Sequence, residues 1–289
     1  MNAGILYALA TYILWGLFPI YWKQVAYVPA AQLIGHRIFW SFVLLIVIIL
    51  ATRQWGKFRA KLDAKSLKSH GLAALLLSVN WLTYVWAVNN GFIVESSLGY
   101  FINPLLSVLL GMIFFKEKLR PIQWIPLGLA TIGVLYLSFA YGRLPWIALT
   151  LAFSFAFYGL LKKKSTLGSL YGLTLETGIM LIPALAYLAY AASTGEGAFL
   201  QIDQRTDYFL MGAGVVTTIP LILFAKAAQR IPLTMIGLMQ YIAPTGQFLI
   251  GVLLYKEGFS ATQAIGFGIV WTALIFFWIE GWWSRKRRV

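Results

Sequence analysis

The sequence predicts an all-α integral membrane protein of ten transmembrane helices, built as two inverted-topology repeats of five helices each. Three observations predict this fold class. Of the 289 residues, 60% are hydrophobic and only 11% are charged, which is more apolar surface than a soluble domain can bury. Ten apolar blocks each have about the 20 residues that a helix needs to cross a bilayer. The stretch from Leu98 to Gly128 recurs 140 positions later, from Leu238 to Gly268.

The apolar blocks follow one another with little between them, and the mean hydropathy of the chain is +0.78. The first block lacks a basic leading segment and a small-residue cleavage site, so we interpret it as a retained span. Only the connections 53–70 and 193–206 are long. The ten blocks are 3–22, 31–52, 71–90, 97–115, 122–140, 144–161, 169–192, 207–228, 232–255 and 261–281.

The repeated stretch indicates a duplication. Ten of its thirty-one positions are identical without a gap, and they include Pro104 with Pro244 and Glu117 with Glu257. Matching residues of these types in one register are not expected by chance in an apolar chain. Five spans per copy is an odd number, so the second copy enters the membrane in the opposite direction. We therefore divide the chain into a first repeat, 1–141, and an inverted second repeat, 142–289, and expect a midplane solute site between them.

The basic residues set the expected orientation. Alternate connections carry seventeen Lys and Arg on one side and four on the other, which predicts cytoplasmic N- and C-termini. The chain has a net charge of +14, and most of its basic residues lie between the apolar blocks and at the C-terminal end. There they are expected to meet anionic lipid head groups at the cytoplasmic face, and no nucleic-acid partner is expected.

Enzyme chemistry is not expected. The chain has no cysteine, two histidines far apart and nine scattered acids, so no metal site or cofactor is predicted. It also has no phosphate-binding glycine loop. Because no ATP-binding motif is present, uphill transport would need an ion gradient or exchange.

Four runs of residues resemble one known family over essentially the whole chain. They are Asn80-Trp81, 95–105, 219–224 and 237–244. They closely resemble the RarD branch of the drug/metabolite transporter superfamily, the EamA-type permeases. This resemblance implies ten helices in two inverted repeats, a bacterial inner-membrane location and transport of small metabolites. It also implies a central cavity lined by the first four helices of each repeat, with the fifth helix more peripheral.

The fourth and ninth spans each carry a polar face. Tyr100 and Asn103 share one helical face of the fourth span with Ser107, and their repeat mates include Gln240 and Gln247. Polar side chains facing lipid cost free energy, so both faces must point inward. We expect them to line a cavity, with interhelical hydrogen bonding as the alternative.

Two further spans contribute candidates. The third span presents Asn80 and Tyr84 on one face, and the first presents Trp15 near mid-membrane, where it could stack on a planar solute. Trp22, at the end of its span, is interpreted as an interfacial anchor.

Ionisable residues inside the spans are the strongest functional signal. The second span carries His36 and Arg37, and the seventh carries Glu176. We expect Arg37 to need either Glu176 or a bound anion, and Glu176 to be the group that couples transport to protons. A purely structural ion pair is the alternative. His70 is interpreted as a residue of the basic loop without a role.

The sequence therefore predicts a monomeric secondary transporter, an exporter of a small organic solute. A passive channel for a small polar solute is the alternative, because inverted repeats also build channels. The expected solute-contacting residues are Trp15, His36, Arg37, Asn80, Tyr84, Tyr100, Asn103, Glu176, Gln240 and Gln247.

Overall fold

The structure is a computed structural model that describes residues 2–90, 92–140, 144–256 and 260–286. Within these ranges the regular structure is entirely helical, which confirms the predicted all-α class. Short 3₁₀ segments follow α2 and precede α7, and a π-helical turn spans Ile250–Leu254. The α-helices are α1 (Ala3–Gly16), α2 (Phe18–Trp22), α3 (Ala30–Ala51), α4 (Trp55–Ala60), α5 (Ala64–Asn89), α6 (Ile93–Phe115), α7 (Trp124–Ala140), α8 (Trp146–Lys164), α9 (Ser169–Ser193), α10 (Gln204–Ala228), α11 (Leu233–Gln240), α12 (Ile242–Leu249) and α13 (Ala261–Lys286).

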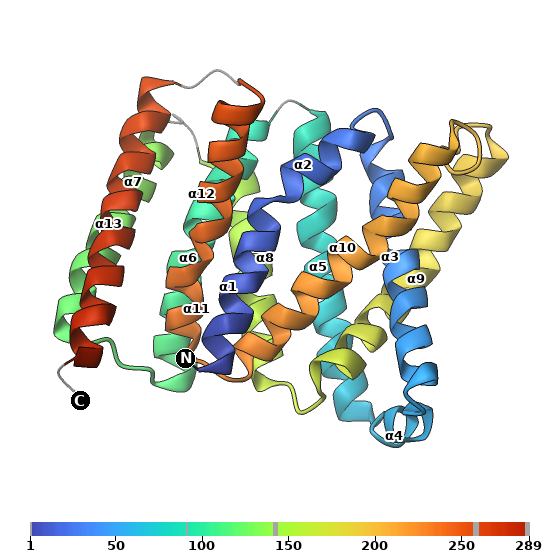
Figure 1. The fold of residues 1–289 in the computed structure, drawn as a ribbon, viewed down its shortest axis with the longest axis horizontal. Coiled ribbons are helices and arrows are strands. Elements are labelled where there is room, and N and C mark those ends of the chain that lie inside the picture. Colours follow the sequence, from blue (N-terminus) through green and yellow to red (C-terminus); the bar gives the residue numbers. More distant parts are fainter. Residues whose placement is uncertain (1, 91, 141–143, 257–259, 287–289) are drawn as a thin grey trace.

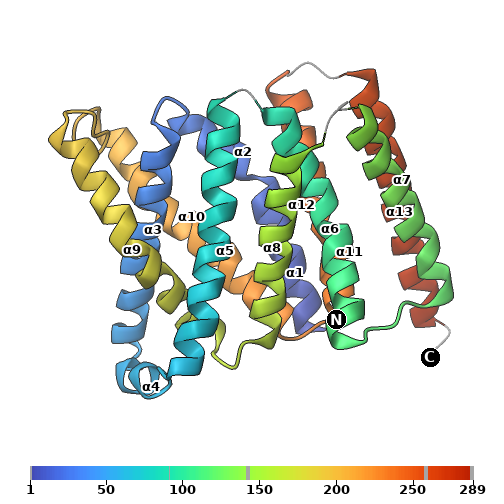
Figure 2. The same cartoon turned by 180° about the vertical axis from the view of Figure 1, so that it is seen from behind.

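Most of these helices are suited to a membrane. Eight segments of the described chain are long and apolar enough to cross one, and a ninth apolar stretch, Ala264–Phe277, lies within α13. The block 71–90 is not among them, so the count of ten spans stays a prediction. α5, which contains that block, begins earlier, at Ala64, and its first turns carry polar and basic residues. It nevertheless packs along α8 and α9, and both ribbon views show it running beside them (Figures 1 and 2).

The two halves of the chain pack against each other reciprocally. α1 packs on α10 and α12, whereas α8, the first long helix of the second half, packs on α5 and α6. Helices in corresponding positions also meet, as α3 meets α9 and α6 meets α11. α7 and α13 pair with each other at one edge of the molecule (Figures 1 and 2). Two five-helix units related by a two-fold axis would give this pattern.

The molecule has two distinguishable ends. α1 begins and α13 ends at the same end of the helices, where α4 also lies (Figure 1). We call this the terminal end and the opposite one the far end. α3 and α6 begin at the far end, so residues early in these two helices lie near it.

Close helix contacts join the halves at the centre. A Cβ atom on Gly246 of α12 would lie only 3.1 Å from the Cα atom of Gly16, at the end of α1. A Cβ atom on Gly237 of α11 would lie 2.5 Å from the carbonyl oxygen of Pro104 in α6. A larger side chain at either glycine would push the two helices apart.

The repeated prolines have different effects on their helices. α6 continues through Pro104, whereas the helix around Pro244 is divided into α11, α12 and the π-helical turn. The backbone at the repeated Lys-Glu pair has the same conformation in both copies. Lys116 and Lys256 both lie in the left-handed helical region, with φ of 53° and 57°. Lys116 caps the C-terminus of α6, so the repeated Lys-Glu pair does mark a helix end there.

At the far end, the connection after α9 folds back over the start of α3. The side chain of Gln32 donates to the carbonyl of Glu196 at 2.7 Å and accepts from the amide of Ala198 at 2.8 Å. Asp203 then caps α10 by accepting from the Thr206 amide at 2.6 Å. The hydrogen bonds from Thr206 lower the pKa of the Asp203 carboxyl.

Candidate functional site

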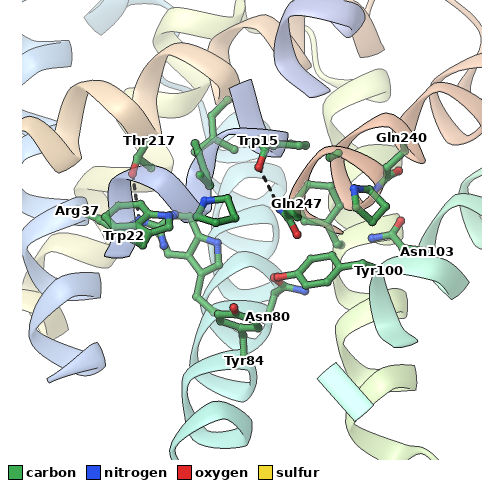
Figure 3. A pocket seen from close by; sticks show the side chains of 17 residues that line it. Trp15, Trp22, Arg37, Asn80, Tyr84, Tyr100, Asn103, Thr217, Gln240 and Gln247 are labelled. Atoms are coloured by element: carbon green, nitrogen blue, oxygen red, sulfur yellow. Dashed lines mark hydrogen bonds between the residues drawn. The ribbon is translucent and has the colours of Figure 1, made fainter. Parts of the chain in front are cut away.

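A cavity of about 290 Å³ lies among the helices of both halves, close to the smallest size of typical small-molecule sites, about 300 Å³. Its wall combines aromatic rings, amides and a guanidinium, and the labelled side chains come from several helices (Figure 3). Its lining residues are Trp15, Phe18, Pro19, Trp22, Arg37, Asn80, Trp81, Tyr84, Tyr100, Asn103, Phe155, Thr217, Leu221, Gln240, Ala243, Pro244 and Gln247.

One side of the cavity is built around Arg37, in the second turn of α3. Its guanidinium lies over the ring of Trp22 at 4.9 Å and over that of Trp81 at 4.5 Å, measured to the ring centroids. Its Nε donates to the hydroxyl of Thr217 at 3.0 Å. Stacking and this hydrogen bond together fix the plane and direction of the guanidinium. Trp22 thus lines the cavity, and its interpretation as a simple interfacial anchor is wrong.

The opposite side is built from amides on the two repeated helices, as Figure 3 shows for Asn103, Gln240 and Gln247. The Ser107 hydroxyl donates to Asn103 Oδ1 at 3.3 Å, and the Gln247 amide donates to the carbonyl of Trp15 at 3.0 Å. These bonds leave Asn103 Nδ2 and Gln247 Oε1 unused, and both residues line the cavity.

Asn80 connects two helices across the cavity wall. Its Nδ2 donates to the carbonyl of Leu151 at 2.9 Å and to the hydroxyl of Ser154 at 3.0 Å. These bonds tie α5 to α8 within the wall. Asn80 therefore both lines the cavity and joins two helices by hydrogen bonds.

An aromatic cluster forms the floor of the cavity toward the terminal end. Trp15 contacts Phe155 and Phe224, with ring centroids 5.6 Å apart in both pairs. Tyr158 stacks on Phe224 at 6.1 Å and lies 5.7 Å from Phe155. These four residues are called the aromatic floor below.

A buried polar cluster lies directly beneath the aromatic floor. Glu176 is fully buried and accepts from Lys162 Nζ at 2.7 Å and from the Tyr158 hydroxyl at 3.2 Å. His70 Nδ1 lies 2.6 Å from the same carboxylate, and its Nε2 lies 3.0 Å from the hydroxyl of Ser165. The carboxylate thus has a cation, an imidazole and a hydroxyl as partners.

Of the two alternatives expected for Arg37, a pair with Glu176 or a bound anion, the structure excludes the pair with Glu176. Glu176 lies outside the cavity lining and is held by Lys162 and His70. The two residues occupy nearly equivalent repeat positions, 139 apart, but lie toward opposite ends of the molecule, with the aromatic floor between them. Arg37 is therefore left without a carboxylate partner among the described residues.

His36 is also placed differently from the prediction. It is buried, lies outside the cavity lining, and contacts Phe199 of the far-end connection at 5.2 Å between ring centroids. Because Arg37 follows it directly on the helix, the two side chains point about 100° apart. The other eight expected residues all line the cavity; whether they bind a solute stays a prediction.

Sequence reasoning missed His70 and Lys162. His70 was assigned to a loop, but it lies on α5 three, seven and ten residues before Ala73, Leu77 and Asn80, all of which are buried. That helical spacing was the available signal. From the sequence, Lys162 was placed in the basic connection after the block 144–161. In the structure α8 continues through Lys164, and the side chain of Lys162 is buried.

The terminal end is closed by contacts between the halves. The carboxylate of Glu117, just after α6, accepts from the amides of Leu233 and Thr234 at 2.8 Å each, at the start of α11. Lys163 of α8 donates to the carbonyl of Ile231 at 2.8 Å and lies 3.4 Å from Glu117. α6, α8 and α11 are therefore joined here by an N-terminal cap and an ion pair.

Comparison with known proteins gives consistent similarities. A model described as the EamA-like transporter family matches residues 2–139. The "Uncharacterized transporter YojE" of Bacillus subtilis is 45% identical, over 95% of this chain and 93% of the relative. "Protein RarD" of Escherichia coli is 41% identical, over 98% of this chain and 96% of the relative. A solved crystal structure at 18% identity superposes with a TM-score of 0.71, over 95% of this chain and 97% of the other, which shows a shared fold.

Proposed function

Because the chain belongs to the EamA-like transporter family, among its RarD-like members, we propose that it is a secondary active transporter. It carries a small organic metabolite or drug-like solute outward by alternating access between two inverted repeats, 1–141 and 142–289. The observation that carries this proposal is a polar cavity between the two halves, with an aromatic floor and a closed terminal end.

This arrangement favours a carrier over the alternative, a passive channel. A channel needs a continuous path, whereas here the aromatic floor and the Glu176 cluster fill the space between the cavity and the terminal end. Carrying a solute past them requires the halves to move relative to each other, which is alternating access. The reciprocal packing of the halves supports such a motion. If the halves tilt so that the terminal end opens, equivalent contacts of the other repeat can close the far end.

The proposed setting is the bacterial inner membrane, with the terminal end in the cytoplasm and the protein acting as a monomer. The basic connections support this orientation through their attraction to anionic lipid. It can be tested with single cysteines at Lys61 and Ser193, both exposed, because the chain has no other cysteine. An impermeant maleimide added outside intact cells should label the Ser193 position and spare the Lys61 position; the reverse pattern contradicts the orientation.

The transport proposal is tested by comparing extracellular metabolites of cells that overexpress the chain with cells that carry an empty vector. An Asn103→Leu chain expressed at the same level serves as the second control. We expect at least one small solute to accumulate outside only with the unaltered chain. Its flux into proteoliposomes should saturate and be stimulated by solute on the other side. No protein-dependent solute, or a flux without saturation and trans-stimulation, contradicts the carrier.

A further inference from the structure

We propose that the cavity binds its solute as an organic anion, with a carboxylate on Arg37 and a neutral hydrogen-bonding group at the amide side. This assignment rests on the proposed transport function and names its substrate class. The separation of the two sides is visible in Figure 3, where Arg37 and Trp22 lie at one edge of the cavity and Asn103 and Gln240 at the other.

The first argument is the way in which Arg37 is held. Its guanidinium lies over the rings of Trp22 and Trp81, and its Nε donates a hydrogen bond to Thr217. Its two terminal nitrogens have no hydrogen-bond or ion-pair partner in the part of the chain that the structure describes. A planar fork fixed by stacking, with its terminal edge unused, matches the two oxygens of a carboxylate.

The second argument is charge. Among the described lining residues, Arg37 is the one side chain that is charged at neutral pH. The counter-ion candidate that the sequence suggested, Glu176, is bound by Lys162 and His70 beneath the aromatic floor. A solute carboxylate would therefore neutralise the cavity. An ammonium group would find no carboxylate in the described lining, so a cation or a zwitterion would bury an unpaired charge.

The third argument is the polarity of the rest of the cavity. Ser107 and the Trp15 carbonyl use one end each of the Asn103 and Gln247 amides, which leaves Asn103 Nδ2 and Gln247 Oε1 for a ligand. A neutral donor and acceptor pair suits a hydroxyl or an amide group. The rings of Tyr84 and Tyr100, 6.0 Å apart in an edge-to-face arrangement, lie along the same wall and suit an apolar or aromatic body between the two ends.

A set of three probes with one shared skeleton tests this assignment. 4-Hydroxyphenylacetate carries a carboxylate and a hydroxyl at opposite ends of a ring, 4-hydroxyphenylacetamide is its neutral analogue, and tyramine is a cationic one. Binding to the purified protein is measured by isothermal titration calorimetry. We expect the acid to bind about tenfold or more tightly than the amide and tyramine, as one charge-assisted hydrogen bond or more would give.

Variants assign the preference to Arg37. Arg37→Gln should bind the acid and the amide about equally, and Arg37→Lys should retain a reduced preference for the acid, since it keeps the charge and loses the fork. Lys226→Gln removes a cation of α10 that lies over Tyr7, outside the cavity, and should leave the preference unchanged. Equal binding of acid and amide by the unaltered protein, no binding of the acid, or an unchanged preference in Arg37→Gln overturns the anion site.

The nature of the transported solutes gives an independent outcome. Protein-dependent extracellular solutes should be carboxylates without an amino group, and their accumulation should be lost in Arg37→Gln. If these solutes are neutral or cationic, the anion assignment fails while the transport function stands. If no solute depends on the protein, the transport function itself fails, and the assignment that rests on it fails too.

Discussion

Arg37 and Glu176 occupy nearly equivalent positions of the two halves, 139 residues apart, yet their surroundings differ. Glu176 is fully buried, and Lys162, His70 and Tyr158 contact its two oxygens. Arg37 is only partly buried, lines a cavity, and has aromatic faces and one hydroxyl as its neighbours. An ionisable side chain inside a membrane helix is therefore not by itself a binding site; its remaining hydrogen-bonding capacity distinguishes the two cases.

The difference has a physical cause. A charge buried in a low-dielectric interior needs an opposite charge and hydrogen bonds at close range, and Glu176 has both. Arg37 is stabilised by stacking and by access to the cavity, which leaves its terminal nitrogens able to bind a ligand. The Glu176 cluster thus belongs to the closed end of the molecule, and Arg37 belongs to the candidate site.

The largest expected effect comes from removing the charge of Glu176. Glu176→Gln leaves Lys162 buried without a counter-ion, and breaking a buried pair in this way costs about 3–5 kcal/mol of stability. We expect a strong decrease in monodisperse folded protein in detergent and a lower melting temperature. Unchanged thermal stability of Glu176→Gln would contradict a structural role for the pair.

The matched control replaces both partners. Lys162→Met combined with Glu176→Leu removes the charges together and should recover much of the stability lost in Glu176→Gln. The same double variant decides the prediction that Glu176 couples transport to protons. If pH-gradient-driven transport persists without the carboxylate, Glu176 is not the coupling group; if only exchange at equal pH persists, the coupling prediction is supported.

The second effect concerns the cavity and should leave the fold nearly intact. Asn103→Leu and Gln240→Leu each remove an amide from the wall, and we expect transport to fall by about tenfold or more, equivalent to about 1.4 kcal/mol of lost binding. Ser107→Ala is the control for Asn103, because it removes only the donor to its Oδ1. Loss of folded protein in either Leu variant would instead indicate that the amide makes a structural hydrogen bond. The amide would then have a structural role like that of Glu176, rather than a role in binding the solute.

Much of the fold and of the cavity could be predicted from the sequence because both depend on periodicity. Polar residues at helical spacing, such as Tyr100 and Asn103, must point inward in a membrane protein, and their repeat mate Gln240 locates the opposing face. An internal repeat therefore predicts not only which residues are polar and internal but also which ones face each other.

The partners of the ionisable residues could not be predicted in this way. Sequence positions place Arg37 and Glu176 at nearly equivalent places in two inverted copies, but inversion puts them at different depths. Arg37 therefore lines the cavity, whereas Glu176 is held outside it by Lys162. Two partners of Glu176, His70 and Lys162, lie at helix ends that the apolar blocks 71–90 and 144–161 did not include, because α5 begins at Ala64 and α8 ends at Lys164. Helix ends depend on capping and packing more than on hydropathy, as Lys162 in the last turn of α8 illustrates.

The smallest expected effect is at the terminal end, where Glu117 caps α11. Glu117→Ala removes both hydrogen bonds to the amides of Leu233 and Thr234, which should destabilise the closed terminal end by about 1 kcal/mol. Opening of that end should then increase about fivefold. A single cysteine at Leu221, on the cavity wall, reports this change through its labelling by an impermeant maleimide in inside-out vesicles.

Lys163→Gln is the matched control for Glu117→Ala. It removes the neighbouring cation, partly exposed at 17%, but keeps the cap, so its effect on labelling should be smaller, as for an exposed ion pair. If Glu117→Ala leaves labelling from the terminal end unchanged while protein stability falls, the cap stabilises α11 alone. In that case the closed end depends on the aromatic floor and the Glu176 cluster, and the Glu176 cluster would be the principal barrier that a carrier must open beneath its binding cavity.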